Sequence, residues 1–267
     1  MHSQKKLTIA IPTYNRWSYL QDLLGLLFLQ CFQSPSVCEN IEILISDNAS
    51  SDDSQFLPQY IDKNSPLESL TIRYIRNECN IGADENFLRC IQEAKGEFVW
   101  LLGDDELLEN EAVTTILEVI DSMSPRLLIL MDKNYSSGVT KNKVFSNYGQ
   151  LVSFFCKINP HFVLAHTLIS LNVFRKSAFC LEFARSKIKT NYLHMYGIML
   201  DLISKGPVVL LIEKPLVIVR DDRAPFHLKP RMLGIKQGLY MLHVGRRSNN
   251  FSFTLYALKF LLKQFRF

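Results

Sequence analysis

The first hundred residues alternate between short β-rich runs and segments whose apolar residues recur at helical spacing, and this alternation limits the fold more than any other feature. The segments 17–30 and 87–95 have the helical spacing. Before, between and after them lie short β-rich runs that end at turn-forming residues, as strands do. These runs are LTIAIP (7–12), IEILIS (41–46), LTIRYI (70–75) and FVWLL (98–102). Strands that alternate with helices favour a mostly parallel sheet covered on both faces, so we expect an α/β fold.

Polar residues gather where each predicted strand ends. The four clusters are PTYNR (12–16), SDNASSDD (46–53), NIGADEN (80–86) and GDDE (103–106). Each alone has a structural explanation, because Asp, Asn and Gly are favoured in turns and at helix N-caps. In a parallel sheet, however, the carboxyl ends of the strands meet at one edge, and ligands bind beyond that edge. Four clusters at one edge therefore favour a single binding site.

The chemistry of these clusters suggests a nucleoside diphosphate held together with a divalent metal. Mg²⁺ and Mn²⁺ prefer carboxylate oxygens and complete their coordination with water and phosphate, which the adjacent Asp104 and Asp105 suit. Asp47 can accept hydrogen bonds from a base or ribose, and the loop that carries Tyr14 can wrap the base. The glycine-rich dinucleotide fingerprint and the Walker phosphate loop are both absent from the sequence, which argues against the usual Rossmann and P-loop sites.

Three blocks of the sequence resemble, in order and spacing, the motifs of family 2 glycosyltransferases with the GT-A fold. They are IAIPTYNRWSYLQDLL, ILISDNASSDDS and NECNIGADENFLRCIQEAKGEFVWLLGDDELLEN, within about residues 7–125. The resemblance implies a nucleotide-diphospho-sugar transferase fold, with a mostly parallel central sheet flanked by helices. The pattern of the tail adds a C-terminal helical extension. We expect a GT-A domain at 1–230, with a nucleotide-binding half at about 1–125 and an acceptor half at about 126–230, followed by a helical segment at 231–267.

The same resemblance assigns the site residues. It implies a divalent metal, Mn²⁺ or Mg²⁺, bound by Asp105, and it places Gly103 where the family carries a further aspartate that Asp104 could replace. It also implies the residues that bind the nucleotide sugar, namely Pro12, Thr13, Tyr14, Arg16, Asp47, Asn48, Asn80, Gly82, Asn86 and Asp104. The NIGADENFL and GDDE variants look similar to abequosyltransferases and related enzymes of bacterial O-antigen and capsule assembly. That likeness implies an unusual sugar donor and a lipid-linked oligosaccharide acceptor.

The catalytic base is harder to assign. Inverting members of the family commonly use a carboxylate of an ED pair that opens a late helix, and the corresponding stretch here, 190–206, contains no such pair. His194 stands near the expected place, and an imidazole can take a proton near neutral pH, although a histidine satisfied by packing is an equal alternative. Asp132 ends a further predicted strand, LLILMD, and could face the acceptor. His166 lies on an apolar strand predicted at 165–170, and both His166 and Asp201 are more typical of structural residues. The stereochemical course stays open.

Two further segments carry candidate residues. The loop DDRAPFHLKPR (221–231) could fold over the donor, with Arg223 neutralising the diphosphate, although a plain surface loop is the alternative. In the tail at 251–267, Lys259, Lys263 and Arg266 would share one stripe of a helix that is otherwise apolar. That pattern is typical of a helix lying at a membrane surface, and packing on the domain or on a partner is the alternative.

Composition narrows the class of protein and its location. The formal net charge of +4 and the lack of an arginine-rich run argue against a nucleic-acid partner. The six cysteines lack zinc-site spacing, and no signal peptide or membrane-spanning apolar run is present, so we expect a cytoplasmic protein, with peripheral contact to the inner membrane as a further prediction. Two alternatives to a glycosyltransferase stay open: a sugar nucleotidyltransferase, and a non-catalytic protein that binds nucleotide sugar or glycan.

Overall fold

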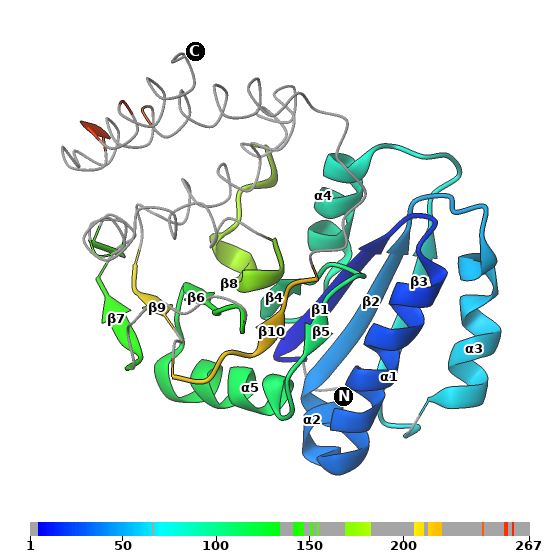
Figure 1. Cartoon of the computed structure of the whole chain (residues 1–267), viewed down its shortest axis with the longest axis horizontal. Helices are drawn as coiled ribbons and strands as arrows, with labels where there is room; N and C mark the ends of the chain where they lie inside the picture. Colours follow the sequence, from blue (N-terminus) through cyan, green and yellow to red (C-terminus); the bar gives the residue numbers. More distant parts are fainter. Residues whose placement is uncertain are drawn as a thin grey trace.

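The computed structural model places eight strands in one sheet and two more in a small antiparallel pair, within the part of the chain that it describes (Figure 1). The described residues are 5–65, 67–133, 141–146, 150–151, 169–182, 206–210 and 213–220, together with 154, 242, 254, 255 and 258. The order of the large sheet is β3-β2-β1-β4-β8-β6-β9-β7. Strands β1 to β4 are mutually parallel, whereas β8 is antiparallel to β4 and β6, and β7 is antiparallel to β9. The predicted mostly parallel α/β sheet is confirmed.

The first half of the chain forms the parallel part of this sheet. Its elements are β1 (Leu7–Thr13), α1 (Trp17–Gln33), α2 (Pro35–Asn40), β2 (Ile41–Asp47), the 3-10 turn η1 (Asp53–Phe56), α3 (Leu57–Asn64), β3 (Thr71–Arg76), α4 (Ala83–Glu93) and β4 (Phe98–Leu101). Every residue of β1 and of β2 is buried, because helices cover both faces of the sheet. The four strands predicted in this half are thus confirmed, each to within one residue at either end.

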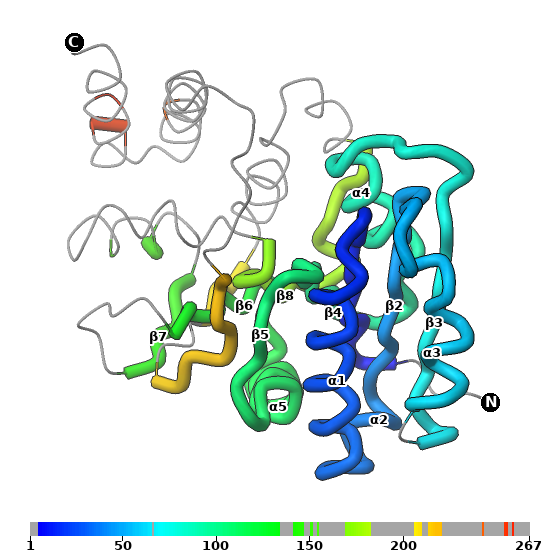
Figure 2. Tube along the Cα trace, turned by 45° about the vertical axis from the view of Figure 1, so that its right-hand side comes forward, coloured from blue at the N-terminus to red at the C-terminus, as the bar shows by residue number. Residues whose placement is uncertain are grey.

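The second half extends the sheet on the far side of β4, as Figure 2 shows. Its elements are β5 (Leu107–Leu108), α5 (Ala112–Met123), β6 (Leu127–Ile129), β7 (Lys143–Phe145), the 3-10 turns η2 (Ile169–Leu171) and η3 (Lys176–Ala178), β8 (Asn172–Arg175), β9 (Val208–Leu210) and β10 (Val217–Ile218). Strand β10 pairs with β5, directly after the GDDE cluster. Residues 217–218, far along the chain, therefore lie beside the segment that follows β4 and the GDDE cluster.

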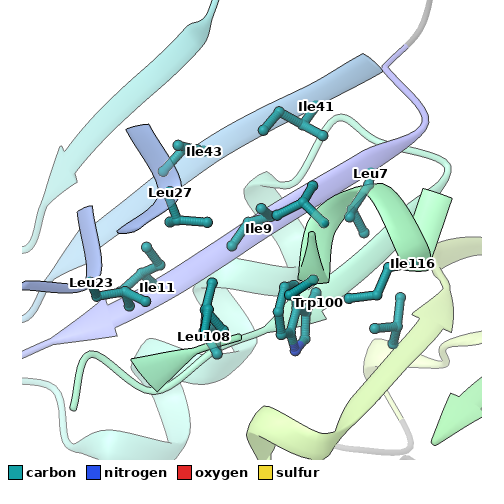
Figure 3. Close-up of a cluster of buried hydrophobic side chains, with 14 of the residues drawn as sticks. Leu7, Ile9, Ile11, Leu23, Leu27, Ile41, Ile43, Trp100, Leu108 and Ile116 are labelled. Atoms are coloured by element: carbon teal, nitrogen blue, oxygen red, sulfur yellow. The ribbon is translucent and has the colours of Figure 1, made fainter. Parts of the chain in front are cut away.

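The core on one face of the sheet is built from alternate residues of the strands. Figure 3 shows Ile9 of β1 and Trp100 of β4 beside Leu27 of α1 and Ile116 of α5, all of them buried. Helix α4 also contacts β1, β2 and β4, but its buried apolar residues lie outside this cluster. Helices α1 and α5 thus cover one face of the sheet and α4 the other.

Two local predictions differ from the structure. Helix α4 begins at Ala83, four residues before the predicted start, because Gly82 takes a positive φ of 85° and turns the chain into the helix. Asp84 and Glu85 then lie in its first turn, where the helix dipole favours negative charge. The segment 165–170 is predicted to be a strand, but its described part belongs to η2. There the carbonyl of Ser170 accepts a hydrogen bond from the indole of Trp100, at 2.8 Å, in place of a strand ladder.

None of the helices in the described part of the chain combines the length and the apolar character that crossing a membrane requires. The predicted helical segment 231–267 lies outside the described residues, apart from positions 242, 254, 255 and 258. The division of the chain at 125 and 230 therefore stays a prediction.

Candidate functional site

The carboxyl ends of the parallel strands bring the first two polar clusters together. In the register of the sheet, Thr13 of β1 pairs with Asp47 of β2, and Asp47 pairs with Arg76 of β3. The chain leaves β4 beside β1, where the N–H of Leu102 donates to the carbonyl of Ala10 at 2.9 Å. The GDDE cluster consequently lies next to the loop that follows β1, as the parallel topology predicts.

Two carboxylates of this edge converge on one guanidinium. Arg16 Nη1 lies 3.2 Å from Asp104 Oδ1 and 2.6 Å from Asp105 Oδ2. The hydroxyl of Thr13 donates to the other oxygen of Asp104 at 2.7 Å. Asp104 is 4% exposed, whereas the side chain of Asp105 is 23% exposed. Arg16 therefore takes the place of a shared cation between an inner and an outer carboxylate.

The inner carboxylate carries a large electrostatic cost. Burial raises the pKa of Asp104 to about 6, and the charge of Arg16 and the hydrogen bond from Thr13 only partly offset this effect. A buried acid with a raised pKa gains from any additional positive charge beside it. Asp104 is thus poised to favour a bound cation.

Gly103 leaves room for the outer carboxylate. A Cβ atom added to Gly103 would lie 3.0 Å from Asp105 Oδ1 and 3.2 Å from the hydroxyl of Ser170. The N–H of Gly103 donates to that hydroxyl at 3.0 Å, and the hydroxyl donates to Glu106 Oε1 at 2.9 Å. A side chain at this position would therefore displace the carboxylate of Asp105. The observed conformation of Asp105 thus depends on having glycine at position 103, where the family resemblance implies an aspartate.

The arrangement fits a single divalent metal of the kind that keeps several non-protein ligands. Within the described residues, no group of three or more His, Cys, Asp or Glu side chains is arranged to hold a metal. Mg²⁺ commonly takes one or two carboxylates and leaves its other positions to water and phosphate. Asp104 and Asp105 meet that requirement, because one oxygen of each already approaches the same nitrogen of Arg16.

Asp47 is enclosed by its own neighbours. Its Oδ1 accepts the N–H of Ser50 at 2.8 Å, and its Oδ2 accepts the hydroxyl of Tyr74 at 2.6 Å and Nη1 of Arg76. Burial and the contact with Asp47 raise the pKa of Tyr74 to about 12, so this hydroxyl stays a donor at neutral pH. Asp47 is 0% exposed, and the structure therefore places it beneath the surface of the site.

Four asparagines link the loop after β2 to the loop before α4. Asn48 donates to Asn80 Oδ1 at 2.8 Å and to the carbonyl of Gly82 at 3.3 Å. Asn77 donates to Asn48 Oδ1 at 2.9 Å and to Asn86 Oδ1 at 3.1 Å. Asn86 is buried, and its amide nitrogen donates to the main chain of β2, so it supports these loops from inside. Asn80 and Gly82 are exposed at the edge of the site.

The loop after β1 is fixed to the loop after β2. The N–H of Asn15 donates to the hydroxyl of Ser50 at 2.9 Å, and the N–H of Ser51 donates to Asn15 Oδ1 at 2.7 Å. Asn15 takes a positive φ of 53°, which asparagine tolerates better than most residues. Tyr14 is exposed on this loop, whereas Pro12 is a buried residue of β1. Tyr14 is consequently available to a ligand and Pro12 shapes the strand end.

Of the two predicted catalytic residues, Asp132 and His194, only Asp132 lies within the described part of the chain. Asp132 is buried beyond the end of β6, where its Oδ1 accepts the N–H of Val219 at 3.1 Å. Its backbone also bridges to Val217 of β10, the strand that pairs with β5. His194 and Arg223 lie outside the described residues, as do His166 and Asp201.

Two residues of the site were missed by the sequence interpretation. Arg76 donates a hydrogen bond to the carboxylate of Asp47. The one feature of the sequence that could have indicated this role is the position of Arg76 at the end of a predicted strand. Ser170 comes from the second half of the chain, 67 residues after Gly103, and no local pattern relates it to the GDDE cluster. Both contacts depend on tertiary structure.

The matching protein family and the relatives of this chain are glycosyltransferases. The family described as "Glycosyl transferase family 2" matches residues 8–178. Abequosyltransferase RfbV of Salmonella typhimurium is 29% identical over 239 residues, which make up 84% of this chain and 69% of the relative. A GalNAc(5)-diNAcBac-PP-undecaprenol beta-1,3-glucosyltransferase of Campylobacter jejuni is 31% identical over 114 residues, or 42% of this chain and 34% of the relative.

Solved structures share the fold at lower sequence identity. TarS of S. aureus in complex with UDP-GlcNAc has a TM-score of 0.65 and 15% identity, over 97% of this chain and 71% of that chain. Mannosyltransferase PcManGT from Pyrobaculum calidifontis in complex with GDP-Man and Mn²⁺ has a TM-score of 0.54 and 12% identity, over 97% of this chain and 70% of that chain. These likenesses concern the fold, and they extend over both halves of the chain.

Proposed function

Because the chain belongs to glycosyl transferase family 2, which it matches over residues 8–178, we propose that it moves a sugar from a nucleoside diphosphate donor to a hydroxyl group of a glycan acceptor. Its fold is the GT-A fold expected from the sequence, with helices on both faces of a mostly parallel sheet. The observation that carries the proposal is the convergence of Asp104 and Asp105 on Arg16, at the edge that also holds Asp47. An acidic pair beside a strand-end loop suits a metal and a diphosphate.

In this proposal Asp105, with Asp104 behind it, holds Mn²⁺ or Mg²⁺. The metal, when bound, supplies positive charge to the diphosphate as it leaves. Thr13 keeps the inner carboxylate oriented through its hydroxyl, and Arg16 can move its guanidinium from the carboxylates to a phosphate oxygen. The exposed Tyr14 borders the nucleoside, and Asn80 and Gly82 border the same site from the loop before α4.

The acceptor and the location are proposed from the relatives. Because one relative is named for an undecaprenol diphosphate-linked acceptor and another is an abequosyltransferase, we propose a lipid-linked oligosaccharide of surface polysaccharide synthesis as the acceptor. The half at about 126–230 would bind it, with Asp132 or His194 as the base, and Arg223 would approach the diphosphate. Contact of the segment 231–267 with the cytoplasmic face of the inner membrane completes this proposal.

The test is thermal unfolding of the full chain with Mn²⁺ and a panel of nucleoside diphosphate sugars and nucleoside triphosphates. We expect the diphosphate sugars to stabilise the protein more than the triphosphates do. A nucleotidyltransferase would show the opposite order. Asp105→Ala should abolish the metal-dependent shift. The matched control is Asp121→Ala, which removes an exposed carboxylate paired with Lys6 away from the site. If no nucleoside diphosphate sugar gives a metal-dependent shift, the proposed function is wrong.

A further inference from the structure

The acid expected to contact the nucleotide base is closed to any ligand. Asp47 is 0% exposed, and both of its carboxylate oxygens accept hydrogen bonds from within the protein. One of these donors is the guanidinium of Arg76, and the side chain of Arg76 is 37% exposed. The group that this pair presents to solvent is therefore the cation.

Arg76 is fixed in place but retains donors. Its Nη1 donates to Asp47, and its Nη2 donates to the carbonyl of Ser50 at 2.7 Å. A guanidinium has five N–H groups in one plane, and Arg76 also donates to the hydroxyl of Tyr74, so two N–H groups remain beyond these three contacts. Opening the pair would leave a fully buried carboxylate without its charge partner, which is strongly unfavourable. We therefore expect the contact between Asp47 and Arg76 to persist when a nucleotide binds.

The position of Arg76 suits the base of a nucleotide whose phosphates lie at the acidic pair. The acidic pair, Asp104 and Asp105, follows β4, which lies next to β1. Arg76 ends β3, three strand positions away in the order β3-β2-β1-β4. Adjacent strands lie about 4.8 Å apart, so the two positions are separated by about 14 Å. That distance is comparable to the length of an extended nucleoside diphosphate, and the exposed Tyr14 lies on the loop after β1.

We propose that Arg76, held by Asp47, is the residue that reads the base of the donor, and that the base carries two adjacent hydrogen-bond acceptors. A planar guanidinium matches such a pair with two parallel N–H groups. Cytosine offers O2 and N3, and guanine offers O6 and N7. Uracil and thymine instead place an N–H donor between their two carbonyl groups. The donor is accordingly a cytidine or guanosine diphosphate sugar, an inference that rests on the proposed function.

The experiment measures binding of CDP, GDP, UDP and dTDP to the full chain by isothermal titration calorimetry in the presence of Mn²⁺. We expect CDP or GDP to bind about 10- to 100-fold more tightly than UDP and dTDP, the range that a bidentate contact to a base provides. Which of the two binds tightly distinguishes the cytosine source from the guanine source. The 3-deaza analogue of CDP or the 7-deaza analogue of GDP, each lacking the ring-nitrogen acceptor, should lose most of that preference.

Protein variants test the residue itself. Arg76→Lys keeps a positive charge beside Asp47 but removes the planar pair of donors, so the affinities for the four diphosphates should come within about threefold of one another. Arg175→Lys is the matched control, because Arg175 pairs with Glu97 near the opposite ends of the strands. It should leave the preference unchanged.

The outcomes separate this inference from the proposed function. If a diphosphate binds but UDP or dTDP binds as tightly as CDP and GDP, or if Arg76→Lys leaves the preference intact, the assignment of Arg76 is wrong while the proposed function stands. If none of the four diphosphates binds in the presence of metal, the proposed function itself fails. The deaza analogues are measured on the unmodified protein, so they decide the matter even if the Arg76 variant does not fold.

Discussion

The raised pKa of Asp104 predicts how the stability of the metal-free protein changes with pH. The carboxyl group goes from an unfolded-state pKa of 3.8 to about 6 in the folded protein, because burial disfavours its charge. Between these two values the folded protein binds more protons than the unfolded chain, so its free energy of unfolding falls as the pH rises. One pKa unit corresponds to about 1.4 kcal/mol, and the full effect above pH 6 is therefore about 3 kcal/mol.

The substitution Asp104→Asn isolates this effect. Asparagine keeps an acceptor for the hydroxyl of Thr13 but does not titrate. The stability of the variant therefore lacks the pH-dependent contribution of Asp104. Between pH 5 and pH 7.5, the original protein should lose about 1.4 kcal/mol of unfolding free energy more than the variant does. Denaturation by urea at both pH values, in the presence of EDTA, measures the difference, and Asp121→Asn serves as the exposed control.

Bound metal should remove this dependence of stability on pH. A divalent cation beside Asp104 favours its ionised form, so saturating Mn²⁺ should remove the excess loss of stability at pH 7.5 from the original protein only. A difference that stays constant between pH 5 and pH 7.5 in EDTA would refute the reasoning from burial. So would a difference of the opposite sign, which would mean that Arg16 outweighs burial.

Three further substitutions probe the same edge of the sheet. Gly103→Ala puts a methyl group 3.0 Å from Asp105 Oδ1, so Mn²⁺ affinity measured by calorimetry should fall about fivefold or more, and an unchanged affinity would contradict the packing argument. Ser170→Ala leaves the N–H of Gly103 and a buried carboxylate with one partner fewer, and urea denaturation should show a loss of about 1–3 kcal/mol; a smaller loss would mean that water replaces the hydroxyl. Arg16→Gln should lower the melting temperature in EDTA more than in saturating Mn²⁺, because the metal replaces the missing charge, and equal losses would refute that exchange.

The fold of the first half follows from local patterns. Strands β1 and β2 are mostly apolar and buried along their whole length because both faces of the sheet are covered, and α1 has the apolar spacing that packs on one of these faces. The second half is different, since β8 and β9 join strands that are distant in sequence, and β8 runs antiparallel to both of its neighbours. Such strands are defined by their partners, so no local pattern predicts them.

The candidate site divides in the same way. The sequence predicts that Thr13, Asp47, Asp104 and Asp105 share one edge, because parallel strands end together. It does not predict which acid is enclosed, because that depends on side chains that reach across strands. The hydroxyl of Tyr74 meets Asp47 only through the register of β2 and β3, and a register cannot be read from composition.

The two arginines at this edge explain why the acids differ in their availability. Asp47 is fully buried under Arg76, so a ligand can reach its charge only by breaking the pair. Asp105 remains 23% exposed beside Arg16, whose own side chain is 38% exposed, so an incoming cation can approach it from solvent. Since a buried pair costs more to open than an exposed one, exchange of partners on metal binding should begin at Arg16 and leave the pair at Asp47 intact. The proposed metal position is therefore adaptable, whereas the proposed base position beside Arg76 is preorganised, and preorganised donors are what discrimination between bases requires.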